Sequence, residues 1–364
     1  MARLAIERAV AGAVKVQGRE LVLFAGCDYL GLAHAPEVRD ALRSGLDRYG
    51  VSASGSRATT GNAVAHDELE RDLARFLGLE AALLVPDGYL SNHVFLQGIA
   101  HARPHAIMDR EAHVSMADAL ASSGLASRTY EFCSARSARE AAREAPNGPL
   151  VILTDGVYPV MRGIAPIREL LEVLPPHGWL VVDDCHGTGI LGARGRGSHE
   201  HAGVADARLV VTGTLSKALG CFGGFVAGSR AVVDDVAARS RAFVGSTPIP
   251  PALAMAGSAA IAVVEHDGSR LARLRANLER VRDLLRRVGV DAHDLPLPVF
   301  AWKAPTPDHG DRAHRTLLDH GVLVPHVRYP DGLGSYFRLA VTAAHDEAAI
   351  AMLEKALPSA LATR

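Results

Sequence analysis

A single lysine, Lys217, stands between two apolar runs in the stretch VVTGTLSKALGCFGGFVA, residues 210–227. Small and hydroxyl residues surround it, and glycines follow at positions 220, 223 and 224. This pattern predicts two short buried strands joined by a tight turn that presents one amine. Such an amine is a candidate nucleophile, because an apolar environment favours its neutral form. On these residues alone, a solvated loop lysine is an equal alternative.

Two adjacent acids, Asp183 and Asp184, follow the apolar run 179–182, and Cys185 and His186 come next. Neighbouring residues of a strand point to opposite faces, so one acid can enter a site while the other caps or binds backbone. A buried carboxylate requires a cationic partner, because burial of its charge alone is costly. Ordinary turn chemistry is the alternative for this pair.

Residues 86–89, Pro-Asp-Gly-Tyr, end a predicted strand and open a predicted helix. Free N–H groups at a helix start favour phosphate, and Gly88 allows a ligand to approach the backbone closely. A lysine for a Schiff base, an acid for a ring nitrogen and a phosphate seat together suit one cofactor, pyridoxal phosphate.

Three further patterns are weaker. In the loop VSASGSRATTGN (51–62), hydroxyl residues such as Ser54 surround Arg57, which suits either an anionic ligand or a plain linker. Glycines at 187, 189 and 192 form a GxGxxG pattern, but no helix start follows them, so a dinucleotide site is disfavoured. Asp183, His186, His199 and His201 lack a recognised metal-ligand spacing; no metal is predicted, and His199 and His201 are expected to be solvated.

The composition bounds the function. The 364 residues carry a net charge of −1, so no basic field is available for nucleic acid or an anionic membrane. No apolar run approaches the roughly 18 residues of a membrane span. The four cysteines form no CxxC pair, which fits a reducing compartment. We therefore expect a cytoplasmic protein with no nucleic-acid or membrane partner.

Short apolar runs alternate with helical patterns between residues 80 and 227, which predicts an α/β fold with a mostly parallel sheet covered by helices. Ligands bind beyond the carboxyl ends of such strands, where His113, Asp155, Asp183 and Lys217 fall. Residues 1–25 are expected to form a short helix and a small hairpin. The expected strands are 81–85, 106–108, 150–153, 179–182, 209–211 and 225–226, and the clearest expected helices are 36–49, 65–77, 90–100, 271–288 and 345–357.

The predicted domains are an N-terminal segment (1–35), a large cofactor-binding α/β domain (36–247) and a smaller C-terminal α+β domain (248–364). Proline residues at 248, 250 and 251 mark the second boundary.

Several longer motifs occur in order along the chain, and with them the chain resembles the α-oxoamine synthases. These are fold-type I pyridoxal phosphate enzymes that include 8-amino-7-oxononanoate synthase and 2-amino-3-ketobutyrate CoA ligase. The motifs are DYLGL (28–32), GSR (55–57), HDELERDLARFLG (66–78), DGYLSN (87–92), VVDDCHGTGILGARGRG (181–197), TGTLSKALG (212–220), GSTPIPPA (245–252) and FRLAVTAAH (337–345).

The resemblance implies a role for each matching residue. Lys217 would form the Schiff base and transfer protons, Asp183 would pair with the pyridine nitrogen, and His186 would lie near the ring hydroxyl. His113 would stack on the ring, and with Lys217 and His186 it completes the implied catalytic set. The remaining implied contacts are phosphate contacts from Gly88, Tyr89 and Thr214, phosphate contacts of a neighbouring subunit from Ser246 and Thr247, and substrate contacts from Arg338, Ser54 and Arg57.

The implied reaction joins a small amino acid to an acyl thioester, either acyl-CoA or an acyl carrier protein, and decarboxylates the product to an α-aminoketone in a homodimer with shared sites. Two positions differ from the family pattern: Cys27 stands where the family has asparagine, and Pro159 where it has serine. These differences leave open an aldolase, a C–C lyase or an aminotransferase on the same scaffold. A non-catalytic subunit of a heterodimer is disfavoured, because it could dispense with Lys217.

Overall fold

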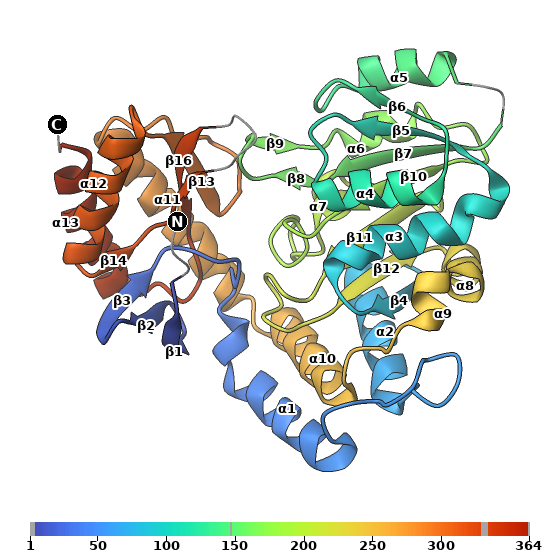
Figure 1. Cartoon of the computed structure of the whole chain (residues 1–364), viewed down its shortest axis with the longest axis horizontal. Helices are drawn as coiled ribbons and strands as arrows, with labels where there is room; N and C mark the ends of the chain where they lie inside the picture. The colour runs from blue at the N-terminus through green and yellow to red at the C-terminus, as the bar shows by residue number, and fades with distance from the viewer. Residues whose placement is uncertain (1–3, 146–147, 329–333, 363–364) are drawn as a thin grey trace. The chain divides into compact units, whose positions relative to one another are not determined.

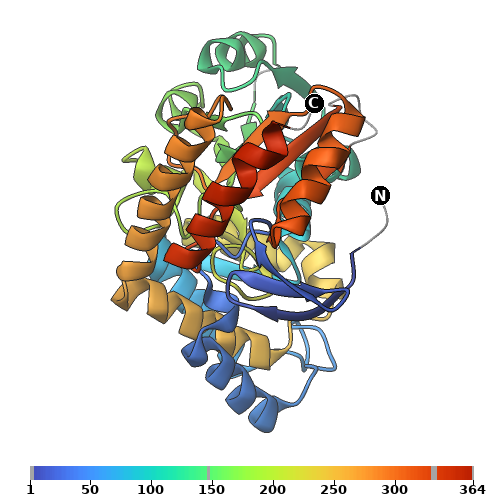
Figure 2. The same ribbon diagram turned by 90° about the vertical axis from the view of Figure 1, so that its left-hand side faces the viewer.

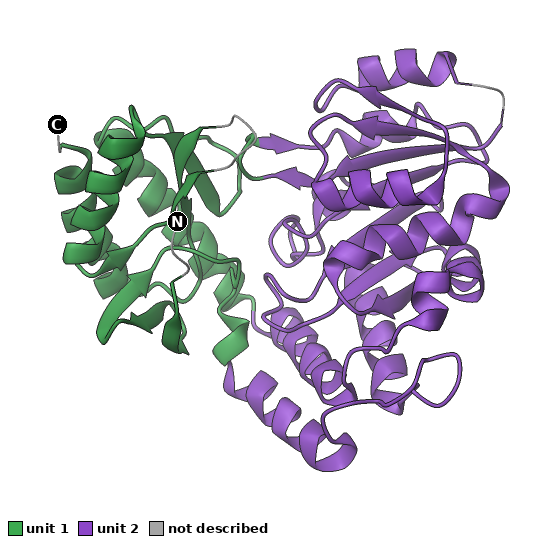
Figure 3. Ribbon diagram, viewed as in Figure 1, with its two compact units in different colours: residues 1–34, 159–162, 268–364 green, residues 35–158, 163–267 purple. Residues whose placement is uncertain are grey.

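The computed structural model describes residues 4–145, 148–328 and 334–362. The chain divides into two compact units (Figures 1 and 3). Unit 1 contains residues 1–34, 159–162 and 268–364, and unit 2 contains residues 35–158 and 163–267. Helix α10 (Pro251–His266) groups with unit 2 in this division. The domain limits at residues 35 and 247 remain predictions.

Unit 2 is built on a seven-stranded sheet of order β4-β12-β11-β10-β7-β5-β6. Strands β11, β10, β7, β5 and β6 run parallel to one another, and β12 is antiparallel to both β11 and β4. The mostly parallel sheet is therefore confirmed. The strands are β4 (Ala81–Val85), β5 (His105–Asp109), β6 (Ser127–Tyr130), β7 (Leu150–Asp155), β10 (Trp179–Asp183), β11 (Leu209–Thr214) and β12 (Gly224–Gly228).

Helices cover this sheet. Apolar side chains of α3, α4 and α8 pack on one sheet face in a single buried cluster, which includes Phe95, Met116, Val151, Val181 and Val236. Two-residue strands β8 (Val157–Tyr158) and β9 (Gly163–Ile164) form a separate hairpin. The helices are α1 (Pro36–Tyr49), α2 (Val64–Leu77), α3 (Gly88–Ile99), α4 (Val114–Ser123), α5 (Ala135–Arg143), α6 (Ile167–Leu171), α7 (Ser198–His201), α8 (Arg230–Arg239), α9 (Arg241–Gly245) and α10, with a 3-10 turn at Ala100–Ala102.

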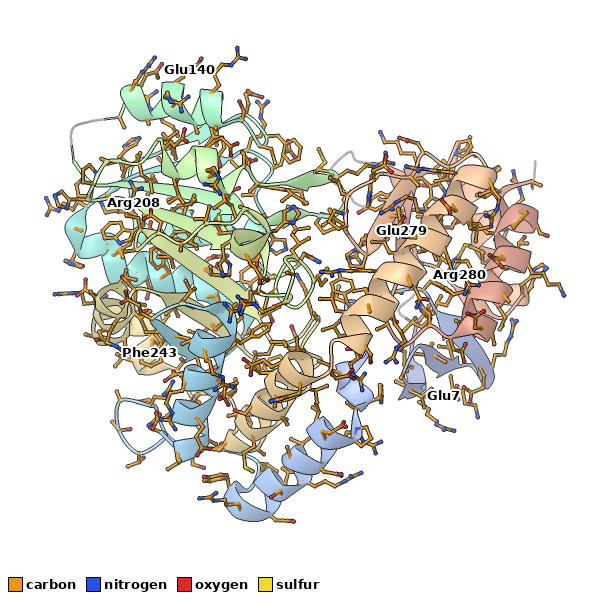
Figure 4. The ribbon with its side chains drawn as sticks, turned by 180° about the vertical axis from the view of Figure 1, so that it is seen from behind. Glu7, Glu140, Arg208, Phe243, Glu279 and Arg280 are labelled. Carbon is orange, nitrogen blue, oxygen red and sulfur yellow. The ribbon has the colours of Figure 1, made fainter. Side chains whose placement is uncertain are left out.

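Unit 1 contains two smaller sheets, of order β1-β2-β3-β14 and β13-β16-β15 (Figure 2). Helix α11 buries one side through Leu274, Leu278, Val281 and Leu285, as the sequence predicts, and Figure 4 shows Glu279 and Arg280 on the same helix. The elements are β1 (Ile6–Val10), β2 (Ala13–Val16), β3 (Arg19–Leu23), α11 (Ser269–Arg287), β13 (Val299–Lys303), α12 (Pro307–Asp319), β14 (Val322–Leu323), β15 (His326–Arg328), β16 (Ser335–Ala340) and α13 (Glu347–Leu361), with a 3-10 turn at Leu32–His34.

Two sequence expectations differ from the structure. The described part of residues 1–25 forms three strands and no helix, because Gly12, at φ +75°, closes a tight turn that pairs Val10 with Ala13. Strand β6 lies outside the expected set, since its residues Ser127–Tyr130 are polar and mostly exposed at the sheet edge. Within the described ranges, every helix is too short or too polar to span a bilayer.

Candidate active site

A pocket of about 360 Å³ lies in unit 2, at the carboxyl ends of strands β7, β10 and β11. Ligand sites of open α/β sheets form at this edge, and the volume falls within the usual range for small ligands. Its lining residues are Asp87, Gly88, Tyr89, His113, Ser115, Asp155, Val157, Asp183, Cys185, His186, Thr214, Ser216 and Lys217. The pocket thus brings together eight residues predicted from the sequence or the resemblance: Gly88, Tyr89, His113, Asp155, Asp183, His186, Thr214 and Lys217.

Lys217 lies in the turn between β11 and the antiparallel strand β12, as the sequence predicts. The turn is closed by Leu215 N–H donating to the Gly223 carbonyl at 2.9 Å and by Gly220 N–H donating to the Lys217 carbonyl at 2.9 Å. Thr214 Oγ1 donates to the same Gly223 carbonyl at 3.0 Å and accepts from Ser216 N–H at 3.1 Å. The amine is half-buried and lines the pocket beside Asp155 and Asp183.

Asp183 ends strand β10 and is only 6% exposed. Its Oδ2 accepts from Asn92 Nδ2 at 2.8 Å and its Oδ1 from Cys185 N–H at 3.2 Å. Asn92 is oriented in turn by Thr212 Oγ1, which donates to its Oδ1 at 2.8 Å. Hydrogen bonds to an ionised carboxylate stabilise its charge, so this network holds a negative charge at the pocket wall.

Asp184 points to the other sheet face and is fully buried. It accepts from Ser198 N–H at 3.0 Å and from Thr188 Oγ1 at 3.2 Å, and the Ser198 hydroxyl also donates to it. A methyl group added at Gly187 or Gly197 would collide with this carboxylate. The glycine-rich segment 187–197 therefore packs directly against Asp184. Burial raises the pKa of Asp184 to about 7 although the Ser198 and Thr188 hydrogen bonds oppose the shift.

His199 corrects one expectation: its side chain is 5% exposed and its Nε2 lies 2.9 Å from the Leu77 carbonyl, so it is buried structure and not a solvated histidine. The sequence offered no signal for this contact, because Leu77 lies 122 positions away.

The start of helix α3 forms a close seat beside Thr214. Asp87 caps the helix by accepting from Leu90 N–H at 3.0 Å, which leaves the Gly88 and Tyr89 amides at the open end. A methyl group added at Gly88 would lie 2.7 Å from the Thr214 Cβ and 3.4 Å from Cys185 Sγ. The helix dipole and these amides favour a phosphate at this point. The Tyr89 hydroxyl is held by Asp118.

His113 precedes helix α4, and its ring lines the pocket. Its ring Nδ1 accepts from Ser115 N–H at 3.3 Å and lies 2.8 Å from Ser115 Oγ. The backbone N–H of His113 donates to Asp155 Oδ1 at 3.1 Å. His186 lines the same pocket one residue after Cys185. The two predicted histidines therefore meet at one cavity from different strand ends.

Five predicted residues lie outside the lining set of this pocket. Arg57 is buried and forms ion pairs with Glu70 and Asp67. Its guanidinium carbon lies 5.7 Å from the centroid of the Phe243 ring, and Phe243 is labelled in Figure 4. Ser54 is exposed at φ +54°. Ser246 is half-buried and Thr247 exposed. Arg338 belongs to unit 1, where it donates to Cys27 Sγ at 3.7 Å.

Six further residues line or support the pocket: Asp87, Asn92, Ser115, Val157, Cys185 and Ser216. Each stands within one or two positions of a predicted residue or inside a quoted motif, which is the signal that the sequence carried. Burial raises the pKa of the Cys185 thiol well above its usual range, and the Asp183 charge adds to the shift, so the thiol stays neutral. In the described part of the chain, no group of three or more His, Cys, Asp or Glu side chains is arranged to hold a metal.

The pocket fits pyridoxal phosphate on its own chemistry. It combines a phosphate seat that tolerates no side chain at Gly88, a hydrogen-bonded carboxylate at Asp183 and the one lysine of its wall, Lys217.

Comparison with known proteins agrees with this chemistry. The model of the "Aminotransferase class I and II" family matches residues 19–357. The chain is 38% identical to 8-amino-7-oxononanoate synthase of Methylococcus capsulatus, covering 96% of this chain and 91% of that protein. It is 37% identical to the enzyme of the same name from Thioalkalivibrio sulfidiphilus, covering 94% and 88%.

The fold is similar to that of solved serine palmitoyltransferases. The enzyme from Sphingomonas wittichii superposes with a TM-score of 0.92 at 25% identity, covering 98% of this chain and 91% of that chain. A variant of the S. paucimobilis enzyme, with a bound PLP–myriocin aldimine, superposes with a TM-score of 0.92 at 23% identity, covering 98% and 92%.

We predict that Gly88→Ala weakens binding of pyridoxal phosphate by roughly 1–3 kcal/mol, because the added methyl overpacks the seat against Thr214. Titration of the cofactor-free protein with pyridoxal phosphate measures the change. Gly268→Ala is the matched control, since a methyl there meets no atom within 4 Å. Equal affinities of the Gly88 variant and the wild type would contradict the seat.

Substitution of Asp184 should affect mainly stability, whereas substitution of Asp183 should affect mainly cofactor binding. Asp184→Asn should lower the free energy of unfolding of the cofactor-free protein by roughly 1–3 kcal/mol, because it leaves buried donors of Ser198 and Thr188 poorly paired. Asp183→Asn should instead act mainly on cofactor affinity. Urea unfolding and cofactor titration of both variants test this division; the reverse pattern would overturn it.

Proposed function

This chain belongs to the aminotransferase class I and II family and to its α-oxoamine synthases, and from that premise we propose that it joins alanine to an acyl thioester. It is a pyridoxal phosphate-dependent acyltransferase of the acyl-condensing type. The observation that carries the proposal is the 38% identity over 96% of the chain, together with Lys217 and Asp183 in one pocket.

The choice of alanine follows from the chemistry of the product in the relatives' name. In 8-amino-7-oxononanoate the amine is on carbon 8, the ketone on carbon 7, and carbon 9 is a methyl group. A decarboxylative condensation takes the amine carbon and its substituent from the amino acid, and a methyl substituent makes that amino acid alanine. Carbons 1 to 7 then come from the thioester, so its acyl group ends in a carboxylate.

Pyridoxal phosphate, when bound, withdraws electrons from the α-carbon of the amino acid and so stabilises the carbanion that attacks the thioester. Lys217 supplies the amine that holds the cofactor and is the base positioned to take the α-proton. Asp183, whose carboxylate is oriented by Asn92, would hold the ring nitrogen of the cofactor. The Gly88 and Tyr89 amides would hold its phosphate, and His113 and His186 line the same cavity.

Unit 1 supports the amino-acid side of the proposal. Arg338 lies on β16 and would receive the substrate carboxylate through its planar guanidinium. Its NH2 group contacts the Cys27 thiol, so the position that differs from the family's asparagine touches the arginine itself. We propose that this contact adjusts which amino acid the arginine accepts.

We also propose a homodimer with shared sites and a cytoplasmic location. The dimer is supported by the accessible side chain of Thr247 in the segment before α10, which leaves it available to a neighbouring subunit. The location is supported by Cys27, Cys133, Cys185 and Cys221, which all carry free thiols as expected in a reducing compartment.

The lysine assignment has a direct test. The chain's lysines are Lys15, Lys217, Lys303 and Lys355. Borohydride reduction of the holoenzyme followed by peptide mapping should label Lys217, and Lys217→Ala should abolish the label and lower turnover by at least roughly 100-fold. Lys303→Ala, which removes an exposed amine, is the control. A stable label on one of the other lysines would refute the assignment.

The reaction has a second test. The holoenzyme should release free thiol from an acyl-CoA whose chain ends in a carboxylate, and alanine should support this release better than glycine or serine. A chromogenic thiol reagent measures the rate, and carbon dioxide release should match it. Consumption of the amino acid without thiol release would favour the alternative aldolase, lyase or aminotransferase reaction.

A further inference from the structure

A second acid, Asp155, lies beside Asp183 in the pocket wall. Strands β7 and β10 are parallel, and their register pairs Asp155 directly with Asp183. Paired residues of parallel strands point to the same face, and adjacent strands lie about 4.8 Å apart. Both carboxyl groups therefore line the same cavity, which contains one amine, that of Lys217.

The two acids differ in their hydrogen-bond donors. Asp183 accepts from Asn92 Nδ2 and from Cys185 N–H, one bond to each oxygen. Asp155 accepts from His113 N–H on Oδ1, and its Oδ2 has no partner among the described residues. Two carboxylates at this spacing in a shielded pocket do not both ionise readily, and the proton resides on the acid with fewer donors.

We propose that Asp155 is a positioning residue that holds a proton when the pocket is at rest. The carboxylate charge facing Lys217 then comes from Asp183 alone. Loss of the Asp155 proton adds a second negative charge beside Lys217 and favours the cationic form of the linkage between that lysine and the cofactor. The inference rests on the proposed cofactor but not on the identity of the substrates.

The surroundings of Asp155 support this arrangement. Burial raises the pKa of Asp155 well above its usual range and the Asp183 charge adds to the shift, while His113 N–H and Lys217 oppose it. Four nearby groups stay neutral because burial raises their pKa values as well: Tyr130, Cys133, Tyr158 and Cys185. The other titratable groups facing Asp155 are Asp109 on β5, His113 before α4, Asp183 and Lys217.

Hydrogen bonds connect the two acids through the pocket wall. Asp155 holds His113 through its backbone N–H, and His113 Nδ1 lies 2.8 Å from Ser115 Oγ. Asn92 Nδ2 reaches both Ser115 Oγ, at 3.2 Å, and Asp183. These hydrogen bonds form a continuous chain from the Asp155 carboxyl to the Asp183 carboxylate.

The proton can be tested first on the cofactor-free protein, with Asp155→Asn as an isosteric neutral variant. A carboxyl whose folded pKa exceeds its unfolded pKa of about 3.9 stabilises the fold at low pH, and this stabilisation is lost as pH rises through the folded pKa. Asp184 contributes a slope of the same sign in both proteins. We expect the melting temperature of Asp155→Asn, relative to the wild type, to rise as pH increases above the unfolded pKa of about 3.9. A difference that stays constant as pH increases overturns the proposal.

The holoenzyme gives the second readout. The visible spectrum of the wild type should shift with pH as the Asp155 proton leaves, and Asp155→Asn should lack that shift while still binding the cofactor. Asp109→Asn is the matched control, because Asp109 also ends a strand of this sheet, is fully buried and does not line the pocket. It should keep a spectral shift, moved toward lower pH, because the Asp109 charge contributes to raising the pKa of Asp155.

Identical spectral titrations of Asp155→Asn and the wild type would refute the proposal. If Asp155→Asn does not fold, Asp155→Ser removes the same titrating group and takes its place. The melting curves require no substrate, so their outcome is independent of whether acyl transfer is found.

Discussion

The burial of a carboxylate at the end of β10 is the constraint on which the site depends. A charge that is 6% exposed has to be compensated by hydrogen-bond donors and by a cation. Asn92 and the Cys185 amide supply the donors, and Lys217 lines the same pocket. The parallel register of β7, β10 and β11 brings these groups to one edge of the sheet.

Helix α3 connects this charge to the phosphate seat. Its first residue, Gly88, packs against Thr214 at the end of β11, and Asn92 one turn later reaches Asp183. One helix therefore fixes the distance between the anion seat and the carboxylate. Gly88 and Asn92 both lie in the N-terminal part of α3, so overpacking at Gly88 and loss of the Asn92 amide would disturb the same end of the helix.

Much of this site could be read from the sequence, because its main residues mark the ends of apolar runs. Lys217 and Asp183 each stand at the end of a buried apolar run, and Gly88 opens a helix. Their types and positions therefore indicate that they lie together at the carboxyl-end edge of the sheet. The division between Asp183 and Asp184 follows from the alternation of side chains along a strand. These are local signals that need no knowledge of the tertiary structure.

The remainder depends on long-range pairing that local patterns do not encode. The pairing of Asp155 with Asp183 requires the register of two strands, and the burial of His199 requires a carbonyl 122 residues away. Arg57, for which the loop sequence left a ligand contact and a plain linker equally open, is enclosed by Glu70 and Asp67 from helix α2. In the N-terminal segment, the Gly12 turn pairs Val10 with Ala13, so strands form where a short helix was expected.

The two differences from the family pattern both lie in unit 1, whereas the cofactor pocket lies in unit 2. Cys27 contacts Arg338, and the segment 159–162 is tied to unit 1 by Arg162, which donates to Asp291 Oδ2 at 2.5 Å and to the Ala301 carbonyl at 3.0 Å. A pocket that keeps its lysine, carboxylate and phosphate seat retains the chemistry of the cofactor. The positions Cys27 and Pro159 touch none of the hydrogen bonds that hold Asp183, so these differences leave that part of the pocket unchanged.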